Sequence, residues 1–378
     1  MRTRGAGTSF VEPGTALDDI DTPALIVDLD RMASNIEAMA RLGQDGKIAL
    51  RPHVKSHKTP ELAIRQVEAG AVGITCQKLG EAEVMADAGL SDITIAYQII
   101  GARKLRRLSD LAHRVRVTTL VDSMEGARPL SEAASADGIT LDTLVEVDDG
   151  YHRCGVLPEH ALPLVRAVAH DLPGLRFVGI LAYEGHIYDL TDRIAVLREA
   201  RRSYDLMGEV VERLRGASIP VARVSVGASA TAQAAADHPV VTELRPGSYI
   251  FNDRYQVSMG AASVEECALS VLATVVSVPA PDRAIIDVGS KGLSWSPPVG
   301  ADGYGLILGH DQATIARLAD EHGIVTVPEG TRPFSIGERV KVIPNSHPPV
   351  VNSFSELLGY RSDRVDVVWP IAARGRMQ

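Results

Sequence analysis

Between about residues 30 and 250, short apolar runs of strand character alternate with longer helical patterns. The apolar runs lie at Ile48–Lys55, Ala71–Cys76, Ile93–Gln98, Val115–Val121, Leu144–Asp148, Phe177–Tyr183, Arg223–Val226 and Val241–Arg245. Helical stretches fill most of the gaps, at Lys78–Ala88, Ser123–Ala134, His160–His170 and Thr191–Arg215. Strands that alternate with helices form parallel sheets, because each helix carries the chain back to the same edge. Eight such strands predict an α/β fold of the (β/α)8 TIM-barrel type.

The chain on either side of this region has a different pattern. A helix is predicted over Arg31–Leu42 with Asp30 as its N-cap, and a short strand over Ala24–Asp28 precedes it and could pair with the barrel. After Asn252, strand-like runs follow one another with turn residues and little helix, at Cys267–Val278, Arg283–Val288, Gly323–Val327 and Arg339–Ile343. We therefore expect two domains, a barrel over residues 30–252 and a mainly β domain formed by residues 1–29 and 253–378.

Composition narrows the class of protein further. The net charge of -9 over 378 residues favours neither nucleic acid nor an anionic membrane as a partner. The three cysteines, Cys76, Cys154 and Cys267, are too widely spaced for a disulfide framework or a cysteine-built zinc site. No apolar run reaches membrane-spanning length, and Met1–Gly14 lacks the apolar core of a signal peptide. We expect a cytoplasmic protein.

The segment Arg51-Pro52-His53-Val54-Lys55 points to chemistry. Strand alternation places Arg51, His53 and Lys55 on one face and the apolar residues on the other. If the apolar face packs on helices, Lys55 points inward at the carboxyl end of the strand, where α/β barrels carry their active sites. A lysine among other cations loses its proton more easily and becomes a nucleophile, as a Schiff-base enzyme requires. The alternative, a solvated basic loop, stays open on the residues alone.

Two further expectations follow from this segment. The same alternation disfavours Lys58 as the nucleophile, since it would lie on the outer face or beyond the strand. For Arg51 we expect a structural role, as a buried cation paired with Glu146 or Asp148.

Motifs spread along nearly the whole chain resemble those of one enzyme family. They are Asp21-Thr22-Pro23-Ala24, Arg51-Pro52-His53-Val54-Lys55, Gly73-Ile74-Thr75-Cys76, Gly80-Glu81-Ala82-Glu83, Glu146-Val147-Asp148, Arg153-Cys154-Gly155-Val156, Ala182-Tyr183-Glu184-Gly185-His186, Arg245-Pro246-Gly247-Ser248-Tyr249-Ile250-Phe251-Asn252-Asp253, Asp287-Val288-Gly289-Ser290-Lys291 and Glu321-His322-Gly323. In order and spread they resemble the D-threonine aldolase and D-serine dehydratase group of fold-type III pyridoxal-phosphate enzymes. The resemblance implies an alanine-racemase-like barrel followed by a β domain.

The resemblance also implies roles for particular residues. It implies pyridoxal 5′-phosphate as cofactor, with Lys55 as its Schiff-base lysine and Arg153 at the pyridine nitrogen. Because an arginine does not give up its proton, that nitrogen would stay neutral and the cofactor would be a milder electron sink. Tyr183 and His186 would line the substrate pocket, where either could accept a proton from a substrate hydroxyl. His53 would stack on the cofactor or tune the lysine, whereas the residues alone equally allow a core histidine bonded to backbone.

Two loops are candidates for the cofactor's phosphate. One follows the seventh strand and contains Ser225, Gly227, Ala228 and Ser229, and the other follows the eighth strand with Gly247, Ser248 and Tyr249. Small residues let backbone N–H groups reach a phosphate, and such barrels bind phosphate after strands seven and eight. Ser229-Ala230 stands where relatives have Thr-Pro. An ordinary strand-to-helix turn is the alternative, and for Gln77, at the end of strand two, a structural role at the barrel rim is favoured.

The loop Pro344–Asn352 departs from the family pattern. Relatives have Pro-Asn-His-x-Cys-Pro or His-x-Asp there, in which the histidine and the cysteine or aspartate hold a divalent metal. Matched without a gap, the two ligand positions hold Ser346 and Pro348. A shift by one residue recovers His347 but places Pro349 at the second position, and proline offers no side-chain ligand. We expect no metal here: His347 would be a ligand only in the shifted register, and otherwise a polar residue lining the entrance.

The function implied by the resemblance is a pyridoxal-phosphate-dependent lyase that acts on D-3-hydroxy amino acids, by retro-aldol cleavage or by elimination of water. Without the metal, a racemase or another α-carbanion enzyme with Lys55 as one base is the first alternative. A non-catalytic cofactor-binding protein is the second, although the large region beyond the barrel favours an enzyme. We expect a homodimer, because enzymes of this fold type commonly complete the active site with the partner's β domain. Asn345–Asn352 or Asp287–Lys291 would supply that contribution.

Overall fold

A computed structural model describes residues 11–296 and 300–378 and divides the chain into two compact units. The first, the β unit, contains Met1–Ile36, Ser56–Thr59 and Ser248–Arg374, and the second, the barrel unit, contains Glu37–Lys55, Pro60–Gly247 and Gly375–Gln378. The expectation about Met1–Gly14 falls mostly on residues 1–10, outside the described residues. Within the described residues, none of the helices is long and apolar enough to cross a membrane.

The barrel unit is built around eight parallel strands. They are β2 (Ala49–Leu50), β3 (Ile74–Cys76), β4 (Asp92–Gln98), β5 (Arg116–Val121), β6 (Leu141–Glu146), β7 (Leu175–Leu181), β8 (Arg223–Val226) and β9 (Glu243–Leu244), hydrogen-bonded in the order β2-β9-β8-β7-β6-β5-β4-β3. The two ends of this order also meet, through a parallel bridge between His53 and Thr75 and a bond from the Val72 N–H to the Leu50 carbonyl. The predicted α/β barrel is therefore confirmed.

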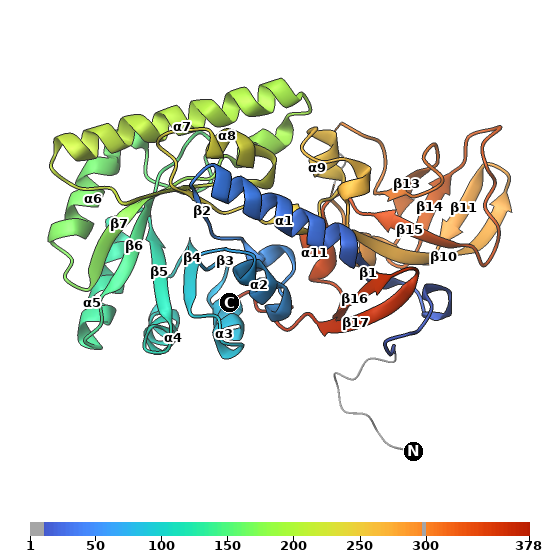
Figure 1. The fold of residues 1–378 in the computed structure, drawn as a ribbon, viewed down its shortest axis with the longest axis horizontal. Helices are drawn as coiled ribbons and strands as arrows, with labels where there is room; N and C mark the ends of the chain where they lie inside the picture. Colours follow the sequence, from blue (N-terminus) through green and yellow to red (C-terminus); the bar gives the residue numbers. More distant parts are fainter. Residues whose placement is uncertain (1–10, 297–299) are drawn as a thin grey trace, which may run out of the picture. The chain divides into compact units, whose positions relative to one another are not determined.

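Helices follow most of these strands. They are α2 (Pro60–Glu68), α3 (Leu79–Asp87), α4 (Ala102–Ala112), α5 (Met124–Ala136), α6 (Ala161–His170), α7 (Arg193–Gly216) and α8 (Ala232–Ala236), while α1 (Leu29–Asp45) precedes β2. Figure 1 shows α3 to α7 on the outer side of the strands. Leu105, Leu108 and Leu111 are buried on α4 at helical spacing, so this helix turns one apolar face inward. Asp192 caps α7, because its carboxylate accepts the N–H groups of Ile194 and Ala195.

The barrel interior holds a buried network of ionic groups. Arg51 donates to Glu243 at 2.9 Å and to Asp92 at 2.6 Å, and Arg223 donates to the same Glu243 at 2.8 Å. Gly73 leaves room for this arrangement, because a Cβ there would lie 2.3 Å from Arg51 Nη1. The structural role of Arg51 agrees with expectation, but the predicted partners Glu146 and Asp148 are wrong. Asp92 and Glu243 begin their strands, whereas Glu146 ends β6 at the opposite edge of the barrel.

Two local predictions near the start of the barrel are wrong. The strand predicted over Ile48–Lys55 is only β2, and Val54–Ser56 forms a 3-10 helix. Between them, the N–H groups of Arg51 and His53 still bond to the Leu244 and Pro246 carbonyls, so the strand-like pairing ends at His53. Lys55 thus lies in a turn just after the strand, where strand alternation does not apply. The N-cap of α1 is Asp28 in place of Asp30, because the Asp28 carboxylate accepts the N–H groups of Asp30 and Arg31.

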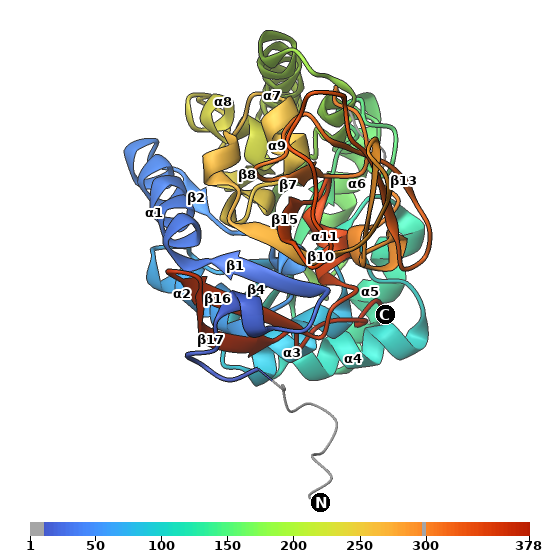
Figure 2. The same ribbon diagram turned by 90° about the vertical axis from the view of Figure 1, so that its right-hand side faces the viewer.

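The β unit is a nine-stranded sheet with short helices. Its strands are β1 (Ala24–Asp28), β10 (Leu269–Ala280), β11 (Arg283–Ile286), β12 (Leu306–Ile307), β13 (Thr314–Leu318), β14 (Gly323–Thr326), β15 (Arg339–Ile343), β16 (Glu356–Arg361) and β17 (Arg364–Pro370), and its helices are α9 (Arg254–Ser258), α10 (Ser290–Leu293) and α11 (His347–Val351). β1 pairs antiparallel with β10 and parallel with β16 (Figure 2). The expectation that it could pair with the barrel is wrong, because both of its edges are already bonded within this sheet.

Candidate active site

Lys55 lies in the barrel unit, in the 3-10 turn Val54–Ser56 that follows β2. Its Nζ is 3.4 Å from Gln77 Oε1 and 5.6 Å from the centroid of the Tyr183 ring. Burial lowers the pKa of Lys55 to about 8, the cations Arg153 and Arg245 lower it further, and Glu81 opposes them. At pH 8 about half of the amine is therefore neutral and nucleophilic. The structure brings this lysine together with polar, aromatic and cationic groups, as a Schiff-base lysine requires.

His53 and Gln77 lie beside this amine. His53 Nε2 is 3.0 Å from Gln77 Oε1, and the His53 ring is buried. Burial lowers the pKa of His53 well below its ordinary value, and Lys55, Arg245 and Arg153 lower it further, so the ring is neutral. The expected structural role of Gln77 is incomplete, since its amide also contacts the lysine and the histidine.

Two tyrosines and one arginine form a cluster, of which the Tyr183 ring lies close to Lys55 Nζ. The rings of Tyr151 and Tyr183 meet edge to face with centroids 5.8 Å apart, and Arg153 Cζ lies 5.1 Å and 4.9 Å from these two centroids. Burial raises the pKa of Tyr183 well above its ordinary value, with smaller contributions from Tyr188 and Glu184, so its phenol stays protonated at neutral pH. The Arg153 side chain remains 45% exposed, which leaves its guanidinium accessible to a ligand.

The His186 ring lies near the Tyr151 ring, with centroids 6.4 Å apart. Its Nε2 is 3.1 Å from Glu199 Oε1, and Arg202 binds the same carboxylate at 2.6 Å. His186 Nδ1 is buried and has no hydrogen-bond partner among the described residues. A neutral ring whose Nε2–H faces Glu199 would present Nδ1 as a proton acceptor.

The predicted phosphate loop after β8 is a tight turn. Gly227 has φ +146°, and a Cβ there would lie 2.7 Å from the Arg245 backbone nitrogen, so the close approach requires glycine. Ala228 is extended, Ser229–Thr231 forms a 3-10 turn that leads into α8, and Thr231 Oγ1 donates to Glu184 at 2.6 Å. This arrangement leaves small residues at the carboxyl end of the strand, as a phosphate cup requires.

The other predicted phosphate residues lie in different surroundings. The Ser225 hydroxyl is buried inside the barrel, where it donates to Glu243 at 2.6 Å and accepts from Arg245 at 2.7 Å. Gly247 is the last residue before the β unit. In that unit Ser248 and Tyr249 begin a 3-10 helix, with Ser248 half-buried and Tyr249 buried.

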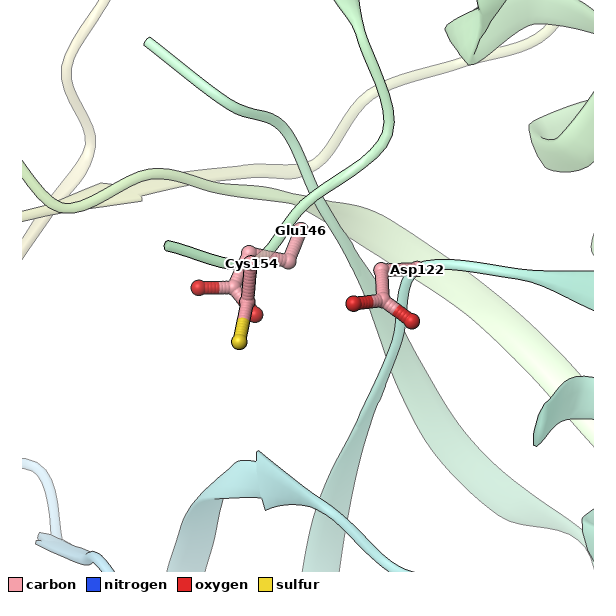
Figure 3. Close-up of side chains that lie close together, drawn as sticks. All are labelled: Asp122, Glu146 and Cys154. Atoms are coloured by element: carbon pink, nitrogen blue, oxygen red, sulfur yellow. The ribbon is translucent and has the colours of Figure 1, made fainter. Parts of the chain in front are cut away.

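One cluster in the barrel unit has the residue types of a metal site. Asp122, Glu146 and Cys154 each offer a ligand atom, and these atoms lie within 4.8 Å of one another (Figure 3). It is the one such group of three within residues 11–296 and 300–378. Gln98 Nε2 donates to both carboxylates, burial raises the pKa of Glu146, and burial raises the pKa of the Cys154 thiol. The Gln98 amide therefore already occupies an acceptor position on each of the two carboxylates, which competes with a cation for the same oxygen atoms.

The loop Pro344–Asn352, where relatives hold a metal, belongs to the β unit. His347 is fully buried in the β unit, so the expectation that it lines an entrance is wrong. Its Nδ1 lies 2.8 Å from Asp253 Oδ2, which also accepts the His347 N–H at 3.1 Å. His347 Nε2 is buried and has no hydrogen-bond partner among the described residues. Its sequence neighbour Pro348 offers no side-chain ligand, and His322, a conceivable replacement, is exposed and belongs to no group of possible ligands among the described residues.

Some residues of the site carry only weak signals in the sequence. Arg245 stands in a recognisable motif, but its influence on Lys55 depends on the neighbouring β2 and β9. Glu199 lies in the second turn of α7 with no motif around it, and its contact with His186 depends on the fold.

Comparisons with known proteins agree with the observed fold and with the order of its barrel and β regions along the chain. The model of the alanine racemase N-terminal domain matches residues 27–254, and that of a putative serine dehydratase domain matches residues 268–360. The chain is 36% identical to the D-threonine aldolase of an Arthrobacter species, over 96% of this chain and 95% of that protein.

Solved structures extend the comparison. The D-threonine aldolase of Filomicrobium marinum superposes with a TM-score of 0.91 at 35% identity, covering 97% of this chain and 100% of that one. The D-threo-3-hydroxyaspartate dehydratase of Delftia sp. HT23 superposes with a TM-score of 0.87 at 31% identity, covering 94% and 98%. With an alanine-racemase-type barrel, a serine-dehydratase-type β region and relatives of this similarity along almost its full length, the chain belongs to the D-threonine aldolase and D-serine dehydratase family of pyridoxal-phosphate enzymes.

Proposed function

We propose that this chain is a lyase that cleaves D-3-hydroxy amino acids by a retro-aldol reaction, with Lys55 as Schiff-base lysine and without a metal in the loop Asn345–Asn352. The observation that carries the proposal is the environment of Lys55. Its buried amine has a pKa of about 8 and lies within reach of Gln77 and the Tyr183 ring at the carboxyl end of the strands. The names of the similar D-threonine aldolases and D-3-hydroxyaspartate dehydratase support this substrate class.

The residues of the barrel unit fit pyridoxal 5′-phosphate. Lys55 would hold its aldehyde carbon, Arg153 would donate to its pyridine nitrogen, and the turn Gly227–Thr231 would receive its phosphate. The close approach at Gly227 supports this assignment, since a side chain there would displace the Arg245 backbone. When bound, the cofactor supplies an electron sink for negative charge at Cα of an amino acid.

The chain's own groups then divide the proton transfers. In a retro-aldol cleavage, a base removes the β-hydroxyl proton, the Cα–Cβ bond breaks, the aldehyde leaves, and a proton returned to Cα completes glycine. We assign His186 as the base, because Glu199 faces its Nε2 and Nδ1 remains an acceptor. We assign Tyr183 to return the proton, because its ring lies 5.6 Å from Lys55 Nζ and its phenol carries a proton at neutral pH.

The loop favours cleavage over loss of water. Hydroxide is a poor leaving group, and elimination is helped by a Lewis acid on the β-oxygen. In the ungapped match, the positions that hold the metal in relatives are Ser346 and Pro348, and in the shifted match they are His347 and Pro349, so a proline stands at the second position in both. Retro-aldol cleavage needs only a base at the β-oxygen, so it loses less when these ligands are missing.

Product analysis tests the proposal. The holoenzyme is incubated with D-threonine, L-threonine, D-serine, D-alanine and D-3-hydroxyaspartate, with and without a chelator. We expect glycine and acetaldehyde from D-threonine, at a rate that the chelator leaves unchanged. Each of four other outcomes contradicts the proposal. A keto acid would indicate elimination, and inversion of the substrate alone would indicate a racemase. No turnover would indicate a non-catalytic cofactor-binding protein, and activity restored only by added zinc or manganese would indicate a metal site.

We also propose that the active form is a homodimer, as the family resemblance implies. Sedimentation of the holoenzyme during turnover measures the mass of the active species. An active monomer contradicts the proposal.

A further inference from the structure

The side-chain amide of Gln77 has one defined orientation. Its Nε2 donates to the Ala96 carbonyl at 3.1 Å. A carbonyl only accepts, so the amide nitrogen must face Ala96 and the amide oxygen must face the opposite way. Oε1 therefore points at His53 Nε2, 3.0 Å away, and at Lys55 Nζ, 3.4 Å away.

The backbone of Gln77 is held equally firmly. Gln77 directly follows β3, and its N–H donates to Glu81 Oε2 at 2.8 Å. The N–H of Lys78 donates to the same oxygen at 3.2 Å, and Glu81 is buried near the start of α3. The amide oxygen is thus pre-positioned by a strand end and a helix start.

This orientation determines where the proton of His53 resides. Because Gln77 Oε1 only accepts, the bond requires a proton on His53 Nε2. The ring is neutral, since burial and the cations Lys55, Arg245 and Arg153 lower its pKa. Nδ1 is then unprotonated and lies 3.5 Å from the Lys55 N–H, as an acceptor should.

The same oxygen counteracts the cations around Lys55. Burial, Arg153 and Arg245 drive the proton off Lys55, and Glu81 favours keeping it. Gln77 Oε1 accepts from Nζ and so holds the protonated amine in place without adding a full charge. A neutral acceptor leaves the amine able to lose its proton near pH 8.

We propose that Gln77 is a positioning residue of the Schiff-base lysine: its amide oxygen holds Lys55 Nζ and selects the Nε2-protonated tautomer of His53. This inference rests on the proposed function for the importance of Lys55, but its geometry is independent of turnover. Replacing the neutral acceptor by an anion should make Lys55 hold its proton more tightly. Removing the acceptor should let Lys55 lose its proton more easily, and the His53 proton should no longer be confined to Nε2.

Two measurements on the full chain test the inference. In long-range nitrogen–proton NMR spectra of the wild type, with His53→Asn for assignment, His53 should carry its proton on Nε2. After removal of the cofactor, acetylation of Lys55 is followed by peptide mass spectrometry as a function of pH. Gln77→Glu should slow this labelling at pH 8 by about three- to tenfold, and Gln77→Met should speed it. Gln44→Glu makes the same chemical change on an exposed part of α1 and should leave the rate unchanged.

The outcomes separate this inference from the proposed function. A proton on His53 Nδ1 in the wild type overturns the inference without any variant, as does a labelling profile that Gln77→Glu leaves unmoved. If borohydride traps the cofactor on another lysine while both measurements come out as expected, the proposed function fails and the role of Gln77 stands. If the cofactor is trapped at Lys55 but the Gln77 variants acetylate Lys55 at the wild-type rate, only the inference fails.

Discussion

Glu243 is the group on which the polar barrel interior depends, and its removal should destabilise the fold strongly. Its side chain is 3% exposed and accepts from Arg51, Arg223 and Ser225. Glu243→Gln keeps the shape but leaves two arginines without their shared counter-charge. Removing one partner of a buried ion pair costs about 3–5 kcal/mol. We expect about 3 kcal/mol, at the lower end, because Arg51 keeps Asp92 and Arg223 keeps hydroxyl partners.

The pH dependence of this loss has a defined sign. Burial alone would raise the pKa of Glu243, but Arg223 and Arg51, with hydrogen bonds from Arg223 and Ser225, hold it below the ordinary value. A lowered pKa contributes stability above the unfolded value near 4.3, and that contribution disappears as the pH falls through the folded value. The difference in free energy of unfolding between wild type and Glu243→Gln should therefore become smaller below about pH 4.

Urea denaturation at pH 8 and at lower pH measures both effects. With a slope near 3 kcal/mol per molar urea, the midpoint of the barrel transition should fall by about 1 M. Glu209→Gln makes the same change on an exposed position of α7 and should stay within about 0.5 kcal/mol of wild type. A loss below about 1 kcal/mol for Glu243→Gln, or a gap that widens in acid, would refute the reasoning.

Three further changes have expected outcomes. Burial raises the pKa of Asp149 to about 6, and Glu184 raises it further, so the charged carboxylate destabilises the fold above that pH. Asp149→Asn should therefore raise the free energy of unfolding at pH 8 by up to about 3 kcal/mol, measured by urea denaturation, and this gain should vanish between pH 6 and pH 4. Gly227→Ala places a side chain against the backbone at a positive φ, so it should weaken cofactor binding at least about tenfold in a spectroscopic titration. An unaltered affinity would show that this turn does not bind the cofactor's phosphate. The double change Ser346→His with Pro348→Cys should bind zinc in metal analysis where the wild type does not, and zinc in the wild type would show that the loop retains a metal site.

The elements with regular patterns were predictable from the sequence. β8, β15 and β1 have the predicted bounds, since each is a short segment rich in branched apolar residues. β16 and β17 were missed. They form a hairpin turned at Ser362 and Asp363, both with φ near +50°, a turn that normally uses glycine or asparagine.

The limits of sequence prediction at the site have a physical cause. Lys55 was predicted from a sequence motif and from strand alternation. The strand ends five residues earlier, so the alternation does not extend to Lys55 and only the motif supports the prediction. The contact of Gln77 with Lys55 and His53 exists because β2 and β3 are neighbours, and no local pattern reports a pairing between strands. The bond between Asp253 and His347 joins residues 94 positions apart, and only the fold brings them together.

The central claim, that Lys55 is the residue that binds the cofactor covalently, has a direct test. The holoenzyme is treated with borohydride, which makes the bond between cofactor and lysine permanent, and is then digested and analysed by mass spectrometry. The account predicts the pyridoxyl mass on the peptide containing Lys55, and its loss in Lys55→Ala. The same mass on Lys58 or any other lysine, or on no peptide at all, would contradict it.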